Sequence, residues 1–395
     1  MRLNTMETKE VAGAEDIVIV GAGIAGLATA LGLHKKGVRS LVLESSPELR
    51  ASGFAFGTWK NAFRALDALG IGDRIRKEHM QAQARDLLLQ ALEEELPRGT
   101  IRYSSKIVSV AEEDGNVKAL QLADGSILRA KLKVAQKEQK EKTHVQVLIG
   151  CDGINSVVAK WLGLAKPSYS GRSAARGFAH YPDGHGFGPN ILQFNGHGFR
   201  SGMMPCNERD VYWFFTFSPS EKDNGVDESA ARMKQFVVSN LRGLKVPSEV
   251  LAAVEKSQMS DVLLAPLRFR PPLSLVTASI SRGCVCVAGD ALHPMTPDLA
   301  QGGCAALEDG VILARCLGET TIINGGIESK RVEAGLREYA RIRRWRSFDL
   351  IATAYVVGLV QQSDNAFVSF LRDRVLSGAL ARRLLRLADY DCGTL

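Results

Sequence analysis

The sequence lacks an apolar run long enough to cross a membrane. Its longest apolar stretch, Leu350 to Val360, has about half the length that a bilayer requires. Residues 1–16 mix acidic and basic side chains, contain no apolar core of signal-peptide length, and are short for a transit peptide. We therefore expect no transmembrane segment and a cytoplasmic location, with a plastid or a peripheral membrane site as alternatives.

The cysteines are few enough and so spaced that they indicate no disulfide framework. The seven cysteines are an odd number without paired spacing in a 395-residue chain, which is typical of free thiols in a reducing compartment. Cys284 and Cys286 lie two residues apart in an apolar run and are expected on one face of a strand, where a metal would lack further ligands. The sequence therefore predicts neither a disulfide-stabilised protein nor a metal centre.

Basic residues exceed acidic ones, but the excess is local. The formal net charge is +7, and the segment from Lys330 to Arg386 alone has twelve basic and five acidic residues. A second basic run, Arg129 to Lys142, has six basic and two acidic residues. Because no recognition fold accompanies these charges, we expect no nucleic-acid partner. We expect the C-terminal arginines to form a solvated helix face, with contact to a membrane surface or an acidic partner as the alternative.

A glycine-rich turn follows the first predicted strand. The β-branched run Asp16 to Val20 leads directly into Gly21, Gly23 and Gly26, a helical run comes next, and a second strand ends at Glu44. The first glycine permits a tight turn, the second lets a pyrophosphate approach the backbone, and the third lets helix and strand pack closely. Glu44 is positioned to accept hydrogen bonds from ribose hydroxyls. This βαβ unit predicts a dinucleotide site but does not distinguish NAD from FAD.

Two further motifs follow apolar strands later in the chain. One strand leads to Cys151-Asp152-Gly153, and another, Gly283 to Ala288, leads to Gly289-Asp290 and the sequence HPMTPDLAQGG. Open α/β sheets bind ligands at the carboxyl ends of their strands, so the three motifs are expected to meet there. A nicotinamide enzyme needs only the first motif, whereas a long dinucleotide that spans the sheet uses all three.

Aromatic residues, only 7% of the chain, are prominent between about residues 168 and 265. Short aromatic strands separated by turns predict a mostly antiparallel sheet there. Trp213 and Phe215 alternate with Tyr212 and Phe214 along one strand, so one face is expected to line a substrate pocket and the other to pack the core. We assign the pocket face to Trp213 and Phe215.

The three motifs, in this order, resemble those of the class A (single-component) FAD-dependent monooxygenases, the class of p-hydroxybenzoate and salicylate hydroxylases. Within this class they are most similar to plant monooxygenases related to zeaxanthin epoxidase. The matching segments begin at Asp16, Leu148 and Val285, and the likeness covers most of the chain from residue 16 on. The resemblance implies an α/β protein with a Rossmann-like FAD/NAD(P)-binding fold, a mostly antiparallel substrate sheet and C-terminal helices.

The resemblance also implies a division of the chain and a set of cofactor-binding residues. We expect a disordered N-terminus at 1–14, an FAD-binding domain at 15–165 and 266–320, a substrate domain at 166–265 and a helical region at 321–395. The residues expected to bind FAD are Gly21, Ala22, Gly23 and Gly26 at the pyrophosphate, Glu44 and Ser45 at the ribose, Arg85, Asp152 and Gly153 in a motif that also serves NAD(P)H, Asp290 at the ribityl chain, and Pro297, Gly302 and Gly303 beside the flavin ring. We expect no catalytic side chain, because the flavin carries the chemistry.

The implied activity is that of an FAD-dependent monooxygenase. It would use NAD(P)H and O2 to insert one oxygen atom into an aromatic or alkene small molecule through a flavin C4a-hydroperoxide. The alternatives are a flavin oxidase or dehydrogenase on the same fold, or a binding protein that has lost tight FAD binding. An NAD-dependent dehydrogenase is disfavoured by the two later motifs. His293 is expected to act either as an acid–base group or as a structural side chain.

Three features depart from the family pattern. Ala300 stands where the family has glycine, which would cost on the order of 1 kcal/mol if that site needs a positive φ. The segment between Met80 and Arg85 is shorter than usual, and residues 131–144 form an apparent insertion. The short segment would leave the flavin ring or the pocket partly uncovered and favour release of peroxide.

Overall fold

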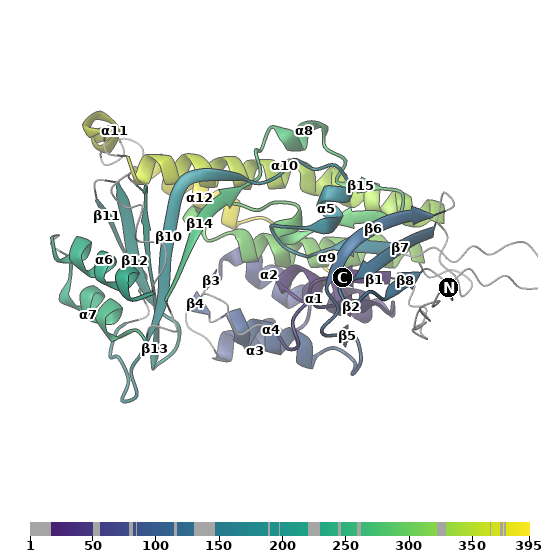
Figure 1. The fold of residues 1–395 in the computed structure, drawn as a ribbon, viewed down its shortest axis with the longest axis horizontal. Coiled ribbons are helices and arrows are strands. Elements are labelled where there is room, and N and C mark those ends of the chain that lie inside the picture. The colour runs from purple at the N-terminus through teal and green to yellow at the C-terminus, as the bar shows by residue number, and fades with distance from the viewer. Residues whose placement is uncertain are drawn as a thin grey trace, which may run out of the picture.

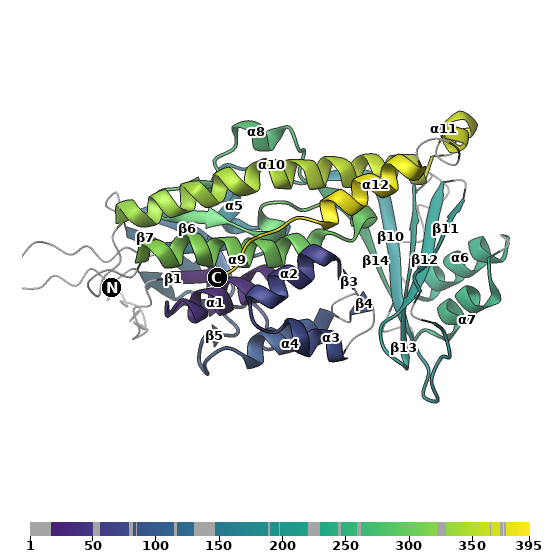
Figure 2. The ribbon, with the colours of Figure 1, turned by 180° about the vertical axis from the view of Figure 1, so that it is seen from behind.

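The computed structural model of the protein describes residues 17–49, 56–78, 82–83, 85–113, 117–129, 147–188, 190–196, 198–219, 230–243, 246–258, 262–321, 329–363, 365–371, 374 and 377–395. These residues form a dinucleotide-binding fold joined to a second sheet, with a long helix running along both (Figures 1 and 2). The N-terminus predicted to be disordered (1–14) and the apparent insertion (131–144) lie outside the described residues.

The first sheet is built from short, fully apolar strands. Its central members β1, β9 and β16 are buried on both faces, which is typical of a parallel sheet covered by helices. β15 alone pairs antiparallel, whereas the other neighbours are parallel. The strand order is β15 (Ser281–Arg282), β16 (Val285–Val287), β9 (Val147–Gly150), β1 (Ile17–Val20), β2 (Leu41–Leu43) and β5 (Ile101–Arg102).

Glycine sets the distance between the two helices that pack most extensively near this sheet. α1 (Ile24–Lys35) lies against α9 (Gly302–Thr321), and a Cβ added at Gly310 would lie 2.6 Å from the Cβ of Ala28. With a larger side chain at Gly310, the two helices could not approach each other as closely.

The remaining elements around this sheet are short. They are β3 (Phe56–Gly57), α2 (Lys60–Ala68), α3 (Gly72–Glu78), β4 (Ala82–Gln83), α4 (Arg85–Glu94), the meander β6 (Ile107–Glu113), β7 (Val117–Leu122) and β8 (Ile127–Arg129), and α5 (Val157–Trp161).

The second sheet is antiparallel and has five strands. Their order is β11 (Leu192–Gly196), β12 (Phe199–Pro205), β13 (Asp210–Phe217), β10 (Ser168–His180) and β14 (Leu263–Phe269). Two amphipathic helices, α6 (Ala230–Arg242) and α7 (Ser248–Lys256), cover one face of this sheet (Figure 1). The expected combination of a Rossmann-like fold, an antiparallel sheet and C-terminal helices is therefore confirmed.

The aromatic alternation on β13 is present, but the face that we assigned to the pocket is wrong. Trp213 and Phe215 are buried in the core beneath α6 and α7, and the Trp213 indole N–H donates to Ser257 Oγ at 2.6 Å. The opposite face carries Tyr212 and Phe214. A period of two fixes which residues share a face but leaves open which face meets the helices.

The C-terminal region consists of α10 (Ser329–Gln361), α11 (Ala366–Leu371) and α12 (Ser377–Ala388), with the short α8 (Ser274–Thr277) beside α10. We expected the arginines of this region to be solvated, but Arg343 and Arg346 are buried. Exposed ion pairs, such as that of Arg337 with Glu333, do occur along α10. None of the described helices is both long and apolar enough to cross a membrane.

Candidate functional site

The loop between β1 and α1 requires glycine at two positions. Gly21 has a φ of +98°, and a Cβ there would lie 2.5 Å from the carbonyl oxygen of Cys151. A Cβ at Gly26 would overlap the carbonyl oxygen of Gly21. The loop therefore stays flat, and α1 begins after Gly23 with no side chain over its first N–H groups. Such a helix N-terminus suits a pyrophosphate, which is the group that an FAD or NAD cofactor would place there.

Glu44 lies at the end of β2, directly beside this loop. Its Oε2 accepts a hydrogen bond from the Ala22 N–H at 2.8 Å, and its Oε1 accepts from the Ser46 N–H at 2.8 Å and from Ser45 Oγ at 3.1 Å. A carboxylate offers about four lone pairs, so one remains for a ribose hydroxyl. Glu44 both fixes the loop and fits the predicted ribose position.

The Asp152-Gly153 turn contacts the loop through Cys151, but Asp152 points back into its own chain. Its Oδ1 accepts from Ser156 Oγ, and its Oδ2 accepts from the Val157 N–H at 2.7 Å, so it caps the start of α5. Burial raises the pKa of Asp152, while these hydrogen bonds act in the opposite direction. Gly153, with a φ of +78° and open space around it, is the part of the motif that a cofactor could approach.

The third motif also reaches the glycine loop. Gly289 has a φ of +59°, and a Cβ there would lie 2.7 Å from the Cβ of Ala25 in α1. Its N–H donates to Asp309 Oδ2 at 2.7 Å. The neighbouring Asp290 carboxylate is exposed and has no hydrogen-bond partner among the described residues, so it can accept from a polyol such as a ribityl chain. The structure thus brings the three motifs together at one edge of the sheet.

Of the two roles expected for His293, the structure favours the structural one. It is fully buried, and its Nε2 lies 2.7 Å from Asp309 Oδ2. Burial alone would raise the pKa of Asp309, but Arg343 and His293 outweigh burial and lower it to about 2. This carboxylate therefore stays charged and holds His293 and the Gly289 turn in place.

A buried charge network, which the sequence analysis missed, supports the same turn. Arg343 donates from Nε to Asp309 Oδ1 at 2.5 Å and from Nη1 to Glu308 Oε2 at 2.7 Å. Glu308 also accepts from Arg346 at 2.7 Å and from Asn61 Nδ2 at 2.6 Å. These residues come from α2, α9 and α10, so no local spacing in the sequence indicates that they meet.

The loop that precedes α9 contains the residues expected beside a flavin ring. Pro297 is exposed in a short 3-10 turn, Ala300 has a φ of +52°, and α9 begins at Gly302, which Gly303 follows. Position 300 therefore adopts the left-handed conformation for which the sequence analysis gave a cost, and alanine occupies it. The start of α9 gives this loop a second helix N-terminus, which could face the electron-rich end of a flavin.

Asp298 ties this loop to the antiparallel sheet. Its side chain is fully buried and accepts from Arg172 at 2.8 and 3.0 Å and from Arg200 at 3.0 Å. Arg172 comes from β10 and Arg200 from β12. Burial lowers the pKa of Arg200, and Asp298 acts against that effect. Arg200 lies opposite Thr216 in the pairing of β12 with β13, so its side chain is on the face that also carries Tyr212 and Phe214. Since Arg200 binds Asp298, this face is turned toward the loop.

This face of the sheet combines aromatic and cationic side chains. Tyr212, Met204 and Cys206 form a buried cluster against which Phe178 and Phe214 pack. The Arg200 guanidinium lies 5.2 Å from the centroid of the Phe214 ring. Burial raises the pKa of the Tyr212 hydroxyl to about 12, so this group stays protonated at neutral pH.

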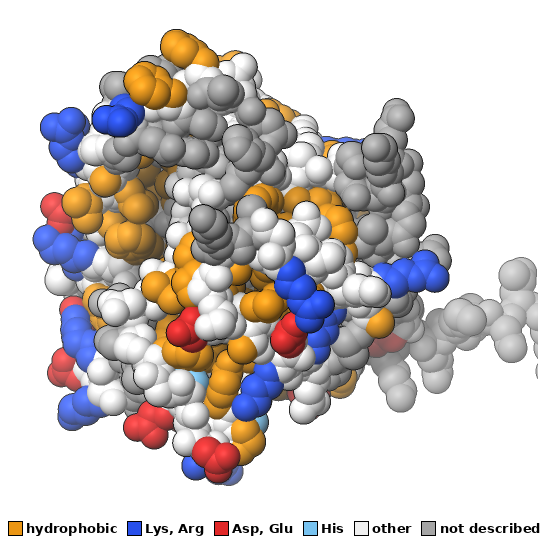
Figure 3. All heavy atoms as spheres, turned by 90° about the vertical axis from the view of Figure 1, so that its left-hand side faces the viewer, with side chains coloured by type: hydrophobic (Ala, Val, Ile, Leu, Met, Phe, Trp, Pro, Cys, Tyr) orange, Lys and Arg blue, Asp and Glu red, His pale blue; other side chains and the backbone are white. Residues whose placement is uncertain are grey.

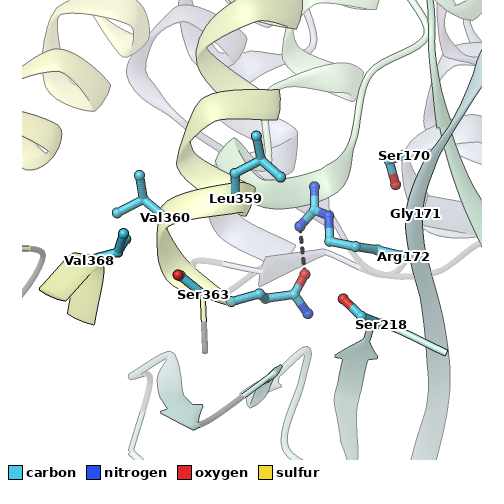
Figure 4. Close-up of a pocket in the computed structure, with 9 residues that line it drawn as sticks. Ser170, Gly171, Arg172, Ser218, Leu359, Val360, Ser363 and Val368 are labelled. Atoms are coloured by element: carbon cyan, nitrogen blue, oxygen red, sulfur yellow. Dashed lines mark hydrogen bonds between the residues drawn. The ribbon is translucent and has the colours of Figure 1, made fainter. Parts of the chain in front are cut away.

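A cavity of about 480 Å³ lies beside Arg172, between β10 and the end of α10 (Figure 4). Arg172, whose Nη1 donates to Gln362 Oε1 at 2.8 Å, forms one wall. Leu359, Val360 and Val368 from α10 and α11 form an apolar wall opposite.

Two further residues, Arg85 and Ser45, were expected to bind the cofactor. Arg85 begins α4, but its side chain lies outside the described residues. Ser45 is exposed beside Glu44. All seven cysteines are free, and all are buried, although burial was expected only for Cys284 and Cys286. The described residues contain no cluster of side chains that could hold a metal ion.

Comparison with known proteins agrees with this geometry. A family profile described as an FAD binding domain matches residues 14–102 and 81–353. The chain is 45% identical to Monooxygenase 2 of Arabidopsis thaliana over 97% of this chain and 98% of that protein, and 34% identical to Monooxygenase 1 of the same plant over 96% and 99%. The first alignment spans 421 positions, more than the 395 residues present here, so that relative contains residues without a counterpart in this chain.

A solved structure matches the same fold. The crystal structure of Klebsiella pneumoniae HpxO with FAD and uric acid superposes with a TM-score of 0.76 at 22% identity, covering 96% of this chain and 98% of that one. At this identity the likeness shows the fold alone, and the family rests on the profile and the plant relatives. The chain belongs to the class A FAD-binding monooxygenases and is an FAD-dependent oxidoreductase.

Proposed function

We propose that the protein uses NAD(P)H and O2 to insert one oxygen atom into a planar aromatic or alkene substrate. The observation that carries this proposal is the Asp298 contact, because it holds the expected flavin loop against the aromatic face of the second sheet. A substrate between the two would lie beside Tyr212, Phe214 and Arg200. This replaces the pocket at Trp213 and Phe215.

The residues present fit FAD. The Gly21–Gly26 loop leaves room for a pyrophosphate at the start of α1, Glu44 for the adenosine ribose, and Asp290 for the ribityl chain. When bound, FAD would accept a hydride from NAD(P)H and activate O2. The protein would orient the substrate on the aromatic face, exclude water from it, and place the N-terminus of α9 near the flavin.

The substrate class follows from the chemistry of that face. The aromatic side chains of Tyr212, Phe214 and Phe178 favour a planar ring. Arg200, whose Nε is buried without a hydrogen-bond partner in the described structure, favours an acceptor oxygen on that ring. The uric acid bound in the HpxO structure is a planar molecule with such oxygens.

An aerobic NAD(P)H oxidation screen with mass spectrometry of the products tests this proposal. We expect a panel of phenolic acids, purine-like rings and alkenes to contain a compound that gains one oxygen atom, labelled when ¹⁸O₂ is supplied. NAD(P)H consumption with stoichiometric hydrogen peroxide and no labelled product across the panel would favour a flavin oxidase instead.

An impaired FAD-fold protein is the second candidate, and the short segment between Met80 and Arg85 favours it. That segment follows α3 and includes β4, which pairs with β3 beside the Ala300 loop. A purified protein that stays colourless after addition of FAD would support this candidate.

A further inference from the structure

The outer side of α10 carries an exposed apolar stripe. Trp345 is 60% exposed, and Val356 and Leu359 are exposed as well. Phe348 and Ala352 lie between them and are half-buried, so that apolar residues recur every three or four positions on one helix face. Helices of globular proteins bury such a stripe against a core, whereas this one faces outward.

Neighbouring elements widen the stripe on both sides. Arg344, next to Trp345, donates to the carbonyl oxygen of Ala278, which directly follows α8. Leu273, which directly precedes α8, is 76% exposed. On the other side, Arg346 donates to the carbonyl oxygen of Leu387 in α12. Hydrogen bonds from Arg344 and Arg346 therefore hold α8 and α12 against α10.

At the end of α10, α11 adds two aromatic rings, Phe367 and Phe370, which are 67% and 59% exposed. Figure 3 views the molecule from this end and shows a few hydrophobic side chains exposed at its top, with others lower on the same face. Of the fourteen exposed large hydrophobic side chains in the described residues, eight belong to this surface, which we call the α10 face: Leu273, Val276, Trp345, Val356, Leu359, Phe367, Phe370 and Leu385. Exposed apolar side chains that cluster on adjoining elements mark an interaction site more often than scattered ones do.

The charge beside the α10 face is positive. From Ala366 to Arg386 the sequence has five arginines and one aspartate. Arg374, Arg382 and Arg386 are exposed, and none of them forms an ion pair within the described structure. Arg383 is the exception, because it pairs with Asp349.

We propose that the α10 face docks on the surface of an anionic lipid membrane. Its tryptophan and phenylalanine rings would enter the headgroup region, and the arginines would contact the lipid phosphates and carboxylates. A second copy of the chain is a poorer occupant, because a two-fold interface would oppose the same basic surface on both subunits. The helices lie along the surface and do not span the bilayer.

Docking would also place the cavity described above beside the lipid headgroups. Leu359 belongs to the α10 face and lines that cavity together with Val360 and Val368. Arg172, on the opposite wall, binds Asp298 of the loop before α9. Arg172 therefore contacts both this cavity and the loop that would lie beside the flavin.

Vesicle sedimentation tests the proposal on the full-length protein. We expect about tenfold more protein to sediment with phosphatidylcholine vesicles that contain phosphatidylserine than with phosphatidylcholine alone, and the difference to shrink as salt is raised. The triple variant Trp345→Ser, Phe367→Ser, Phe370→Ser should lose most of this binding. Arg382→Glu with Arg386→Glu should lose the preference for phosphatidylserine.

Matched controls use exposed residues elsewhere. The variant Val108→Ser, Ile191→Ser, Leu263→Ser and the variant Arg98→Glu, Arg209→Glu should bind vesicles like the wild type. Equal binding by the α10-face variants and the wild type, or no sedimentation with either vesicle, would overturn the proposal, as would a dimer in solution that the triple variant abolishes. FAD content is measured in the same samples, so that a failure of the proposed oxygenation is seen separately.

Discussion

Asp298 and Arg172 form a two-point ion pair, with nitrogen–oxygen distances of 2.8 and 3.0 Å, between the loop before α9 and the first strand of the second sheet. Both side chains are buried, so the carboxylate depends on Arg172 and Arg200 for its solvation. The pair thus couples the expected flavin loop to the expected substrate surface.

The first prediction concerns this pair. Asp298→Asn should lower the free energy of unfolding by about 3 to 5 kcal/mol, because two buried guanidinium groups lose their counter-charge. FAD should also bind more weakly, since Ala300 and Gly302 lie in the freed loop. Urea unfolding and flavin titration measure both effects, and Glu255→Gln, which breaks an exposed pair with Arg242, should cost at most about 1 kcal/mol. Unchanged FAD affinity in the Asp298 variant would contradict the coupling.

The second prediction compares a glycine at which a Cβ would clash with one that has only a positive φ. Gly26→Ala should abolish FAD binding, because the new Cβ would overlap the Gly21 carbonyl oxygen and open the loop. Gly99→Ala, at a φ of +85° with open space around it, should cost on the order of 1 kcal/mol and leave FAD binding intact. Flavin absorbance of the purified variants gives the answer, and retained flavin in Gly26→Ala would show that the loop lies elsewhere.

The third prediction addresses the alanine at position 300. Ala300→Gly should stabilise the protein by up to about 1 kcal/mol, because glycine adopts the left-handed conformation without a Cβ penalty. Ala252→Gly, in the middle of α7 and exposed, should instead destabilise by about 1 kcal/mol. Chemical unfolding of both variants should therefore show opposite signs. A destabilised Ala300→Gly would mean that the alanine methyl makes a compensating contact.

The fourth prediction concerns thiol reactivity. All seven cysteines are buried, and burial raises the pKa of Cys304 to about 12 and that of Cys392 to about 11. Thiolates are the reactive form, so a thiol reagent at neutral pH should modify almost none of them in the native protein and all seven after denaturation. Rapid modification of several native thiols would place those side chains at the surface.

The fifth prediction is a pH dependence of stability. Asp309 has a pKa lowered from 3.8 to about 2 in the folded protein. A lowered folded-state pKa gives stability that is fully present above about pH 4 and is lost as pH falls toward 2, in this case about 2 to 3 kcal/mol. Urea unfolding between pH 5 and 2.5 measures most of this loss, and Asp309→Asn should have a lower stability with a flatter acid limb. An equally steep acid limb in that variant would assign the effect to other carboxylates.

Local patterns predicted the parts of the fold that neighbouring residues determine. The β-branched runs and their following glycines place β1, β9 and β16 and the three motifs, because strand, turn and helix start are encoded within a few residues. Glu44 could be placed beside the loop for the same reason. Two-residue periodicity on β13 identified two faces, but α6 and α7, which cover Trp213 and Phe215, come later in the chain and decide which face is the core.

The site residues that the sequence analysis missed form ion pairs between positions far apart in the sequence. Asp298 is 126 residues from Arg172 and 98 from Arg200, and Arg343 is 34 residues from Asp309. No periodicity reaches across such separations, and a charge count marks Arg343 and Arg346 as surface residues because most arginines are exposed. An aspartate between a proline and a leucine in a glycine-rich loop gave no sign of a buried ion pair.

Flavin titration of the purified protein tests the central claim most directly, namely that the three motifs form one FAD site. We predict that the wild type binds one FAD per chain and that Asp290→Ala, which removes the exposed carboxylate beside Gly289, weakens binding by about tenfold or more. A wild type that stays colourless with excess FAD, or an Asp290→Ala variant with unchanged affinity, would contradict the site described above.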